Sequence, residues 1–333
     1  DAEGIIENVL INDNSCSESA ITIWECFGGT ITINNTTIVS NVSDNNNYNS
    51  GGLSGQAGII INISNSIIYN NYPVNIILDN NFEIPTTANI SYSNIEEELN
   101  GIVTYNNPII NYENNINLDP LFRDPANGNY HLSDYSPCIG AGTLGGVPDT
   151  DIEGNPRPNP SGTLPDMGAY ENALANPIYI LSVDSVYIVH GDTAIVPIRN
   201  HSFLSLLYSI DLNIIGLQEK LEFVDLVTDS NTIFGSQSWI TQYNNTDTLL
   251  ITASAGSNPI DSIGILFALK LAVPDTLSSQ FIPITITDFT GNTDYTDFSV
   301  TAGGVQVVWE PIVGYTSTQT TGAYPLEITF TDT

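Results

Sequence analysis

The chain has 333 residues, of which 37 are Asp or Glu and only 5 are Lys or Arg, so its formal net charge is −32. Binding to phosphates requires clustered Lys and Arg, and this composition therefore excludes nucleic acid as a partner and disfavours anionic membranes and polyanionic sugars. No run of about 18 apolar residues occurs, so no membrane insertion is predicted. The length predicts two or three domains, and the acidity is typical of a secreted, solubilising surface or of a surface that binds divalent cations.

Residues 1–117 contain four similar segments in which a short β-branched run stands between asparagines. They are NVLINDN from Asn8, NTTIVSN from Asn35, NSIIYNN from Asn65 and NISYSNI from Asn89, with starts 27, 30 and 24 residues apart. Such runs alternate inward Ile, Val or Leu with outward polar residues, and Asn and Gly suit left-handed corners. The pattern predicts stacked, right-handed parallel β-coils with Asn ladders and with Ile61 and Ile68 in the core.

Two polar stretches, residues 43–56 and 79–87, interrupt the coils and are predicted to be surface loops. Cys16 and Cys26 are close enough along the chain to form a disulfide outside the cell. The alternative is that both, like Cys138, are small buried side chains. The first coil has no cap in front of it, so we expect preceding coils or a neighbouring molecule to cover it.

Residues 118–171 contain the runs LDPLF, NGNYHL, SPCIGAG, EGNPRP and MGAYE in that order. This segment resembles the end of right-handed parallel β-helix domains, the pectate-lyase-like superfold, in secreted multidomain surface proteins. The resemblance implies a β-helix domain over residues 1–176, closed by LDPLF and YHL as a last coil. It says little about function, because that superfold carries both enzymes and inert stalks.

A β-helix enzyme that cleaves polysaccharides needs two carboxylates about 5–10 Å apart, or carboxylates with calcium and a basic residue. Asp119 and Asp124 are the pair to consider, and Arg123 and Arg157 are the only bases in this half of the chain. The predicted coil faces carry Asn and Ser in place of acids. No catalytic residue is therefore predicted.

Alternating carboxylates at Asp149, Asp151 and Glu153, followed by Gly154, are similar to the start of a calcium-binding loop. A second acidic loop contains Asp288, Asn292 and Asp294. Ca²⁺ is accordingly the one cofactor that the sequence suggests. The distal glutamate of a complete calcium loop is missing after residue 154, and the alternative is that Asp149 and Asp151 cap turns.

Residues 177–308 alternate short strands with turns, which predicts a β-sandwich of the jelly-roll or immunoglobulin-like kind with about nine strands. The motifs are Gly191, Asp192 and Thr193, then residues 208–212, 221–224, 264–271 and 288–292. Their order resembles cohesin domains, the sandwiches that bind dockerins in cellulosomes. The resemblance implies binding of a protein partner, and cohesin-like modules also occur in proteins that have no dockerin partner.

Residues 309–333 form the third predicted part of this all-β chain, and their run GAYPLEITFTDT resembles the first strands of a PKD domain. A complete immunoglobulin-type sandwich needs roughly 100 residues, so this part is expected to be a linker and a truncated module. Tyr324, Leu326, Ile328 and Phe330 alternate along one face of the expected strand. A strand without partners of its own is suited to pair with another molecule.

These patterns together predict a non-enzymatic, extracellular cell-surface protein. The first hypothesis is a filament subunit that joins copies of itself head to tail through strand or end-to-end contacts. The alternative is an adhesin or cohesin-like module for a protein or glycan partner. A polysaccharide-degrading enzyme is the third and least supported reading.

Overall fold

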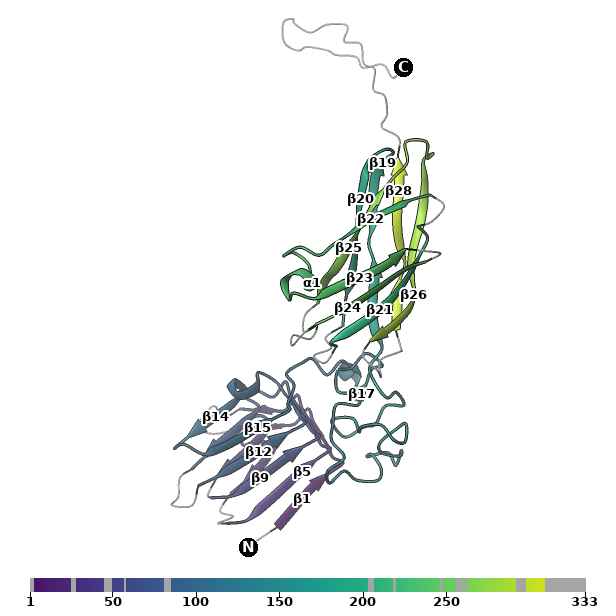
Figure 1. Cartoon of the computed structure of the whole chain (residues 1–333). Helices are drawn as coiled ribbons and strands as arrows, with labels where there is room; N and C mark the ends of the chain where they lie inside the picture. Colours follow the sequence, from purple (N-terminus) through teal and green to yellow (C-terminus); the bar gives the residue numbers. More distant parts are fainter. Residues whose placement is uncertain are drawn as a thin grey trace, which may run out of the picture. The chain divides into compact units, whose positions relative to one another are not determined.

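The computed structural model describes residues 3–24, 28–44, 50–56, 58–80, 85–202, 207–217, 220–245, 248–255, 260, 263–291 and 298–308. They form an all-β protein, as predicted, with one short helix, α1 (Ile233–Ser236), and two 3₁₀ turns, η1 (Glu98–Gly101) and η2 (Pro125–Asn127) (Figure 1). Two compact units can be distinguished, the first mainly within Asp1–Ile180 and the second mainly within Leu181–His201 and Leu207–Asn292. Within the described ranges no helix has the length and hydropathy of a membrane span.

The first unit is wound so that each turn of the chain adds a strand to three parallel sheets, which we call the coil stack. The first sheet contains β1 (Glu3–Glu7), β5 (Thr30–Asn34), β9 (Ile60–Ser64), β12 (Thr87–Ser91) and β15 (Ile109–Glu113). The second contains β2 (Leu10–Asn12), β6 (Thr37–Val39), β10 (Ile67–Tyr69) and β13 (Asn94–Ile95). The third contains β4 (Ile21–Ile23), β8 (Leu53–Gln56), β11 (Ile76–Asp79) and β14 (Ile102–Tyr105), and β3 (Ser15–Cys16) pairs with β7 (Val42–Ser43).

The register of the first sheet defines the length of each turn. Glu3, Thr30, Ile60, Thr87 and Ile109 occupy equivalent positions, so successive turns take 27, 30, 27 and 22 residues. The predicted fourth repeat is therefore wrong by three residues. Asn89 pairs with Asn62 on the strand and not with Asn65 at the corner, because asparagine serves both positions and its spacing alone does not distinguish them.

The corners between sheets use left-handed backbone conformations, as the asparagine pattern predicts. The corner after the first sheet has positive φ at Asn8, Asn35, Asn65, Tyr92 and Asn114, between 45° and 55°. The next corner has positive φ at Asp13, Ser40, Asn70 and Glu97. Tyr92 and Glu97 are not residues that favour this conformation, so the stacking of the turns imposes it there.

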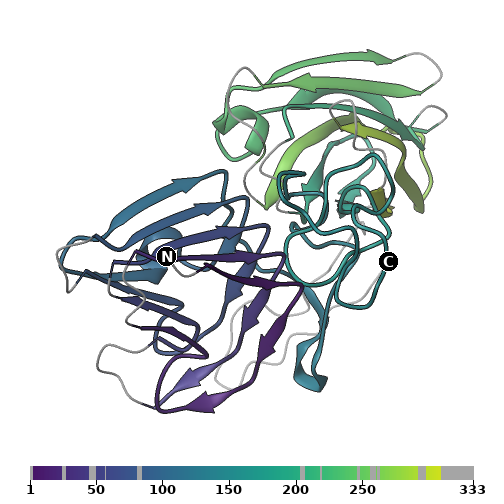
Figure 2. The same ribbon diagram turned by 90° about the horizontal axis from the view of Figure 1, so that it is seen from below.

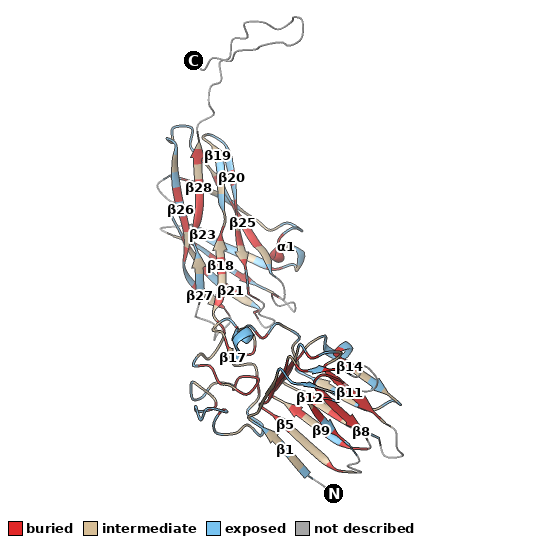
Figure 3. Cartoon of the chain, turned by 180° about the vertical axis from the view of Figure 1, so that it is seen from behind, coloured by how far each residue is buried: buried red, intermediate tan, exposed pale blue. Residues whose placement is uncertain are grey.

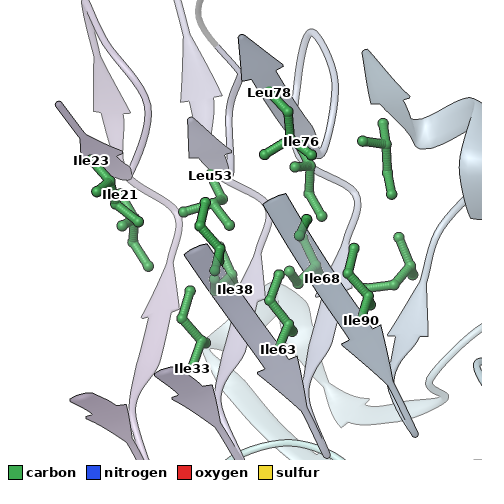
Figure 4. Packing of buried hydrophobic residues seen from close by; sticks show 14 of the residues in the cluster. Ile21, Ile23, Ile33, Ile38, Leu53, Ile63, Ile68, Ile76, Leu78 and Ile90 are labelled. Carbon is green, nitrogen blue, oxygen red and sulfur yellow. The ribbon is translucent and has the colours of Figure 1, made fainter. Parts of the chain in front are cut away.

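The core of the coil stack consists of isoleucines that repeat from turn to turn. Ile33, Ile63 and Ile90 project from the first sheet toward Ile38 and Ile68 of the second (Figure 4). The predicted core positions Ile61 and Ile68 are both fully buried, which confirms the alternation assigned to these strands.

The prediction of a surface loop over residues 43–56 is wrong for its second half. Leu53–Gln56 is strand β8, paired in register between β4 and β11. Its glycines had suggested a loop, but a Cβ at Gly55 would collide with the side chain of Ile61, and a Cβ at Gly51 would collide with backbone atoms of Asn41 and Tyr72. Glycine is present here because the backbone is tightly packed.

Residues 118–176 do not add a last coil, contrary to the prediction. β16 (Phe122–Asp124) and β17 (Asn129–Leu132) pair with each other as an antiparallel hairpin. The chain then returns along the corners of earlier turns, where Asn8 Nδ2 donates to the Thr150 carbonyl (2.6 Å) and Asn65 Nδ2 donates to that of Thr143 (2.9 Å). Figures 1 and 2 show this irregular chain beside the ends of β1 and β5. The segment therefore ties several turns together from the side.

The second unit contains a five-stranded and a six-stranded sheet that are mainly antiparallel. The five-stranded sheet has the order β22 (Glu222–Val227), β25 (Gly264–Ala272), β20 (Thr193–Asn200), β18 (Tyr179–Val183) and β27 (Phe298–Thr301). The six-stranded sheet has the order β19 (Ser185–Val189), β28 (Gly303–Val308), β26 (Gln280–Gly291), β21 (Ser209–Ile215), β24 (Leu249–Ser254) and β23 (Ile240–Asn245).

Burial alternates along these strands, so each sheet has one buried and one exposed face, as in a β-sandwich (Figure 3). The rings of Phe234 and Trp239 stack in the core with centroids 4.9 Å apart, and Phe267 stacks on Phe234 at 5.4 Å. The run YILSVDSVYIV divides at Asp184 into β18 and β19, which belong to different sheets.

Cys138 is a free cysteine and is buried. The side chains of Cys16 and Cys26 lie outside the described part of the chain, and so do all of residues 309–333.

The burial pattern of β9 predicts that a charged residue destabilises the fold at one position and is tolerated at the adjacent one. Ile61 is 0% exposed and Ile60 is 38% exposed. Ile61→Asp buries an unpaired charge and is expected to cost more than about 4 kcal/mol, enough to prevent cooperative folding of the coil stack. Ile60→Asp is the matched control and should change the melting temperature in circular dichroism by only a few degrees. Equal melting of both variants would contradict the register.

Candidate functional site

The carboxylates of the predicted calcium loop in the coil-stack unit do not converge. Glu153 Oε2 lies 3.1 Å from His131 Nε2, whereas the carboxylate of Asp151 accepts from backbone N–H groups. Among the described residues, no group of three or more His, Cys, Asp or Glu side chains is placed to hold a metal ion. A calcium site at Asp149, Asp151 and Glu153 would therefore require a different local arrangement.

Asp151 is instead the centre of a turn. Its carboxylate accepts from the backbone N–H groups of Glu153 (2.9 Å), Asn155 (2.9 Å) and Glu171 (3.0 Å), and from Asn155 Nδ2 (3.0 Å). Burial by itself would raise the pKa of Asp151, but these hydrogen bonds to the ionised form outweigh burial and lower the pKa below its ordinary value. The capping role that the sequence left open for Asp151 accounts for the contacts with Glu153 and Asn155, and the contact with Glu171 joins this turn to a residue 20 positions further along the chain.

The other carboxylates considered as calcium ligands or as a catalytic pair also have hydrogen-bond partners within their own unit. Asp288 lies on β26, where its Oδ2 accepts from Asn213 Nδ2 at 3.3 Å. Its predicted companions, Asn292 and Asp294, lie outside the described residues, and so do the predicted assembly residues Tyr324, Leu326, Ile328 and Phe330. Asp119 accepts from the Leu121 N–H, and Asp124 accepts from Asn127 Nδ2, so each of these two acids closes its own turn.

A buried cluster of one guanidinium and two carboxylates holds the returning segment together. The side chains of Arg157 and Glu171 are 0% exposed and form an ion pair, with 3.2 Å between Nη1 and Oε2. Arg157 also donates to the carbonyls of Asp166, Gly168 and Ala169 at 3.1–3.2 Å. Asp166 accepts from the N–H groups of Gly140 (2.7 Å) and Asn172 (2.6 Å).

Two negative charges face one positive charge in this cluster. Burial, followed by repulsion from Glu171, raises the pKa of Asp166 well above its ordinary value. Burial also raises the pKa of Glu171, although the adjacent Arg157 opposes that rise. Sequence reasoning did not identify this cluster. The available signal was an arginine in a chain with only five basic residues, followed closely by two acids.

On the outer face of the six-stranded sheet, the strands β23, β24, β21 and β26 carry rows of side chains that are polar at all but one of eight positions. We call this part of the face the acidic half. Its first row is Gln242, Thr252, Asp211 and Thr290, and its second row is Asn244, Leu250, Asn213 and Asp288, each in register across the four strands. Ile240 and Leu250 are large apolar side chains exposed on this face. The acidic half therefore combines two carboxylates, several hydrogen-bonding groups and two apolar contacts, and none of these positions is Lys or Arg.

The chain has no match among family models and none among curated proteins. Among solved structures it is similar to the sixth cohesin of scaffoldin B from Acetivibrio cellulolyticus, solved with a Cel5 dockerin mutant. The identity is 19% over 39% of this chain and 99% of that chain, with a TM-score of 0.34. A non-cellulosomal cohesin from Archaeoglobus fulgidus is 22% identical over 39% of this chain and 91% of its own, with a TM-score of 0.33. CaCohA2 from Clostridium acetobutylicum is 18% identical over 39% of this chain and 90% of its own, with a TM-score of 0.33.

The buried cluster predicts that the effect of Arg157→Met depends on pH. At neutral pH the substitution leaves two buried carboxylates without a counter-charge, which is expected to cost about 3–5 kcal/mol. The folded pKa of both acids lies above the unfolded values near 4, so the folded chain takes up protons first as the pH falls. The loss of stability should therefore shrink between about pH 7 and pH 5, measured by denaturant unfolding.

Arg123→Met is the control for this experiment. Arg123 pairs with Asp134 at 3.2 Å, but both side chains are about half exposed, at 50% and 49%. Its removal should cost less than about 1 kcal/mol, with little dependence on pH. If Arg157→Met destabilised the chain equally at pH 7 and pH 5, the assignment of raised pKa values to the two acids would be wrong.

Proposed function

We propose that the chain is an extracellular, non-enzymatic binding protein of the cell surface, in which the sandwich binds a protein partner. The observation that supports this most directly is the acidic half of the six-stranded sheet. An array of exposed and partly exposed groups in register, with apolar side chains among hydrogen-bonding ones, has the composition of a protein-docking surface. The resemblance of residues 177–308 to cohesin domains points to the same class of function.

The charge of the face specifies the chemistry of the partner. Asp211 and Asp288 occupy neighbouring strands in a chain with net charge −32. A partner surface with Lys or Arg opposite these carboxylates would be attracted over a distance of about 10 Å at physiological salt. We therefore propose a partner with a basic contact patch and a small apolar centre, as a cohesin-type interaction with a dockerin-like module would require.

We further propose that residues 1–176, the coil stack with its returning segment, form a right-handed parallel β-helix domain that acts as a spacer. Its parallel sheets and left-handed corners support this proposal, together with the resemblance of residues 118–171 to β-helix ends. The outward positions of its first sheet include Asn62, Asn89 and Asn111, whose amides bond to one another at 2.7 Å and form a structural ladder. Assembly into head-to-tail filaments through the PKD-like residues 309–333 stays a prediction.

Binding to a panel of purified dockerins, measured by calorimetry, tests the proposed protein-binding face. We expect binding to at least one dockerin that weakens as the salt concentration rises. Asp211→Lys together with Asp288→Lys should weaken it by about tenfold or more, because like charges then face each other.

Glu222→Lys together with Asp225→Lys is the matched control, since both residues are exposed on β22 of the other sheet. This pair makes the same change of charge away from the proposed face and should leave the affinity nearly unchanged. If no dockerin bound at high micromolar concentration, or if the control weakened binding as much as the Asp211→Lys and Asp288→Lys variant, the proposed face would be rejected.

A further inference from the structure

The other half of the same sheet face carries no charged side chain. The outward positions of β19, β28 and the first part of β26 are Ser185, Tyr187, Val189, Gly304, Gln306, Val308, Phe281, Pro283 and Thr285, as their cross-strand pairing shows. None of these nine residues is Asp, Glu, Lys, Arg or His, although the chain has 42 charged residues, 37 acidic and 5 basic. This uncharged half differs in chemistry from the acidic half beside it.

Two aromatic rings dominate the uncharged half. Tyr187 is 79% exposed and Phe281 is 47% exposed. Tyr187 pairs with Gln306, and Gln306 pairs with Phe281, so the three residues form one row across three adjacent strands. With strands about 4.8 Å apart, the two aromatic residues stand about 9.6 Å apart, with an amide between them.

Gly304 forms part of the floor of this row. Its φ is +156°, and a Cβ there would collide with the carbonyl oxygen of Ile282 and come within 3.0 Å of the ring tip of Phe281. The ring of Phe281 therefore extends toward a position that has no side chain. An aromatic side chain over glycine presents a flat surface, and Pro283, paired with Gly304, extends this surface along β26.

We propose that the uncharged half is a binding site for a neutral, extended polysaccharide with equatorial linkages. The faces of such sugars carry C–H groups that pack on the negative face of an aromatic ring. Two rings in one row match alternate units of an extended chain, and the amide of Gln306 and the hydroxyl of Ser185 supply hydrogen bonds to sugar hydroxyls. The absence of charge from these nine positions favours a neutral glycan, and the net charge of −32 disfavours an anionic one.

Affinity gel electrophoresis of the whole chain tests the glycan site. The probes are hydroxyethylcellulose and glucomannan as neutral, equatorially linked chains, dextran as an α-linked chain, and polygalacturonate as an anionic chain. We expect retardation by at least one of the first two probes and by neither of the others. Tyr187→Ala and Phe281→Ala should each weaken this binding by about tenfold, and Phe281→Tyr, which keeps the ring, should retain it.

Ile195→Ala is the matched control, because Ile195 is exposed on β20 of the opposite sheet and should not affect retardation. Unchanged melting temperatures of the alanine variants would show that the losses are local. The proposal is overturned if neither neutral probe retards the chain, or if polygalacturonate or dextran retards it as strongly as the neutral probes do. It is overturned too if the aromatic variants bind the neutral probes like the unaltered chain. It is also overturned if Tyr187 and Phe281 contribute only to binding of a protein partner.

The Asp211→Lys and Asp288→Lys variant distinguishes this site from the proposed protein-binding face. It should retain retardation by the neutral glycan, because its substitutions lie on the acidic half. Loss of glycan binding in this variant would contradict two independent sites.

Discussion

In-register stacking of successive turns is the constraint on which the first unit depends. Backbone hydrogen bonds join strands 22 to 30 residues apart, so each outward or inward position repeats directly on the next turn. The same register that brings Ile33, Ile63 and Ile90 into one core also aligns Asn62, Asn89 and Asn111 outside it. A shift by one residue would exchange the two faces and bury the amides.

Stacking also explains the structural role of residues 118–176, the segment that returns along the side of the turns. The turns contact one another mainly through strand pairing, whereas residues 118–176 contact several turns at once. Asn8, Asn34 and Asn65 each donate to a carbonyl of this segment. The segment forms few regular backbone hydrogen bonds, so many of its carbonyl groups need other donors. The buried Arg157 donates to three of these carbonyls. The ion cluster thus stabilises the irregular segment that contacts the stacked turns from the side.

The sandwich shows how one sheet face can carry two chemistries. Alternation along each strand puts half of its residues outside, and the pairing order then decides which of these become neighbours. β26 contributes Phe281 and Pro283 near one end and Asp288 and Thr290 near the other, and a register shift lies between Asn213 and Ile214 of its partner β21. The face changes from uncharged to acidic along this single strand. A protein partner and a glycan would therefore contact adjacent but chemically different surfaces.

Much of this architecture could be read from local patterns. The alternation of Ile with polar residues predicted the strands and the burial of Ile61 and Ile68, and Asn at 8, 35 and 65 predicted left-handed corners. The prediction that Asn89 occupies a corner is wrong, because asparagine is suitable both at corners and in ladders. The prediction of a loop is wrong for residues 53–56, because a glycine-rich composition is the same whether glycine provides a turn or relieves a close contact.

The sequence by itself determined the all-β class, the repeating core and the acidic character, because each depends on residue type and short-range spacing. Only the tertiary structure decided which residues meet over long distances. The pairing of Arg157 with Glu171, the hydrogen bonds from Asn8 to Thr150, and the row of Tyr187, Gln306 and Phe281 join residues whose proximity no local pattern encodes. Such contacts depend on strand order and register, which are set by the packing of the whole unit.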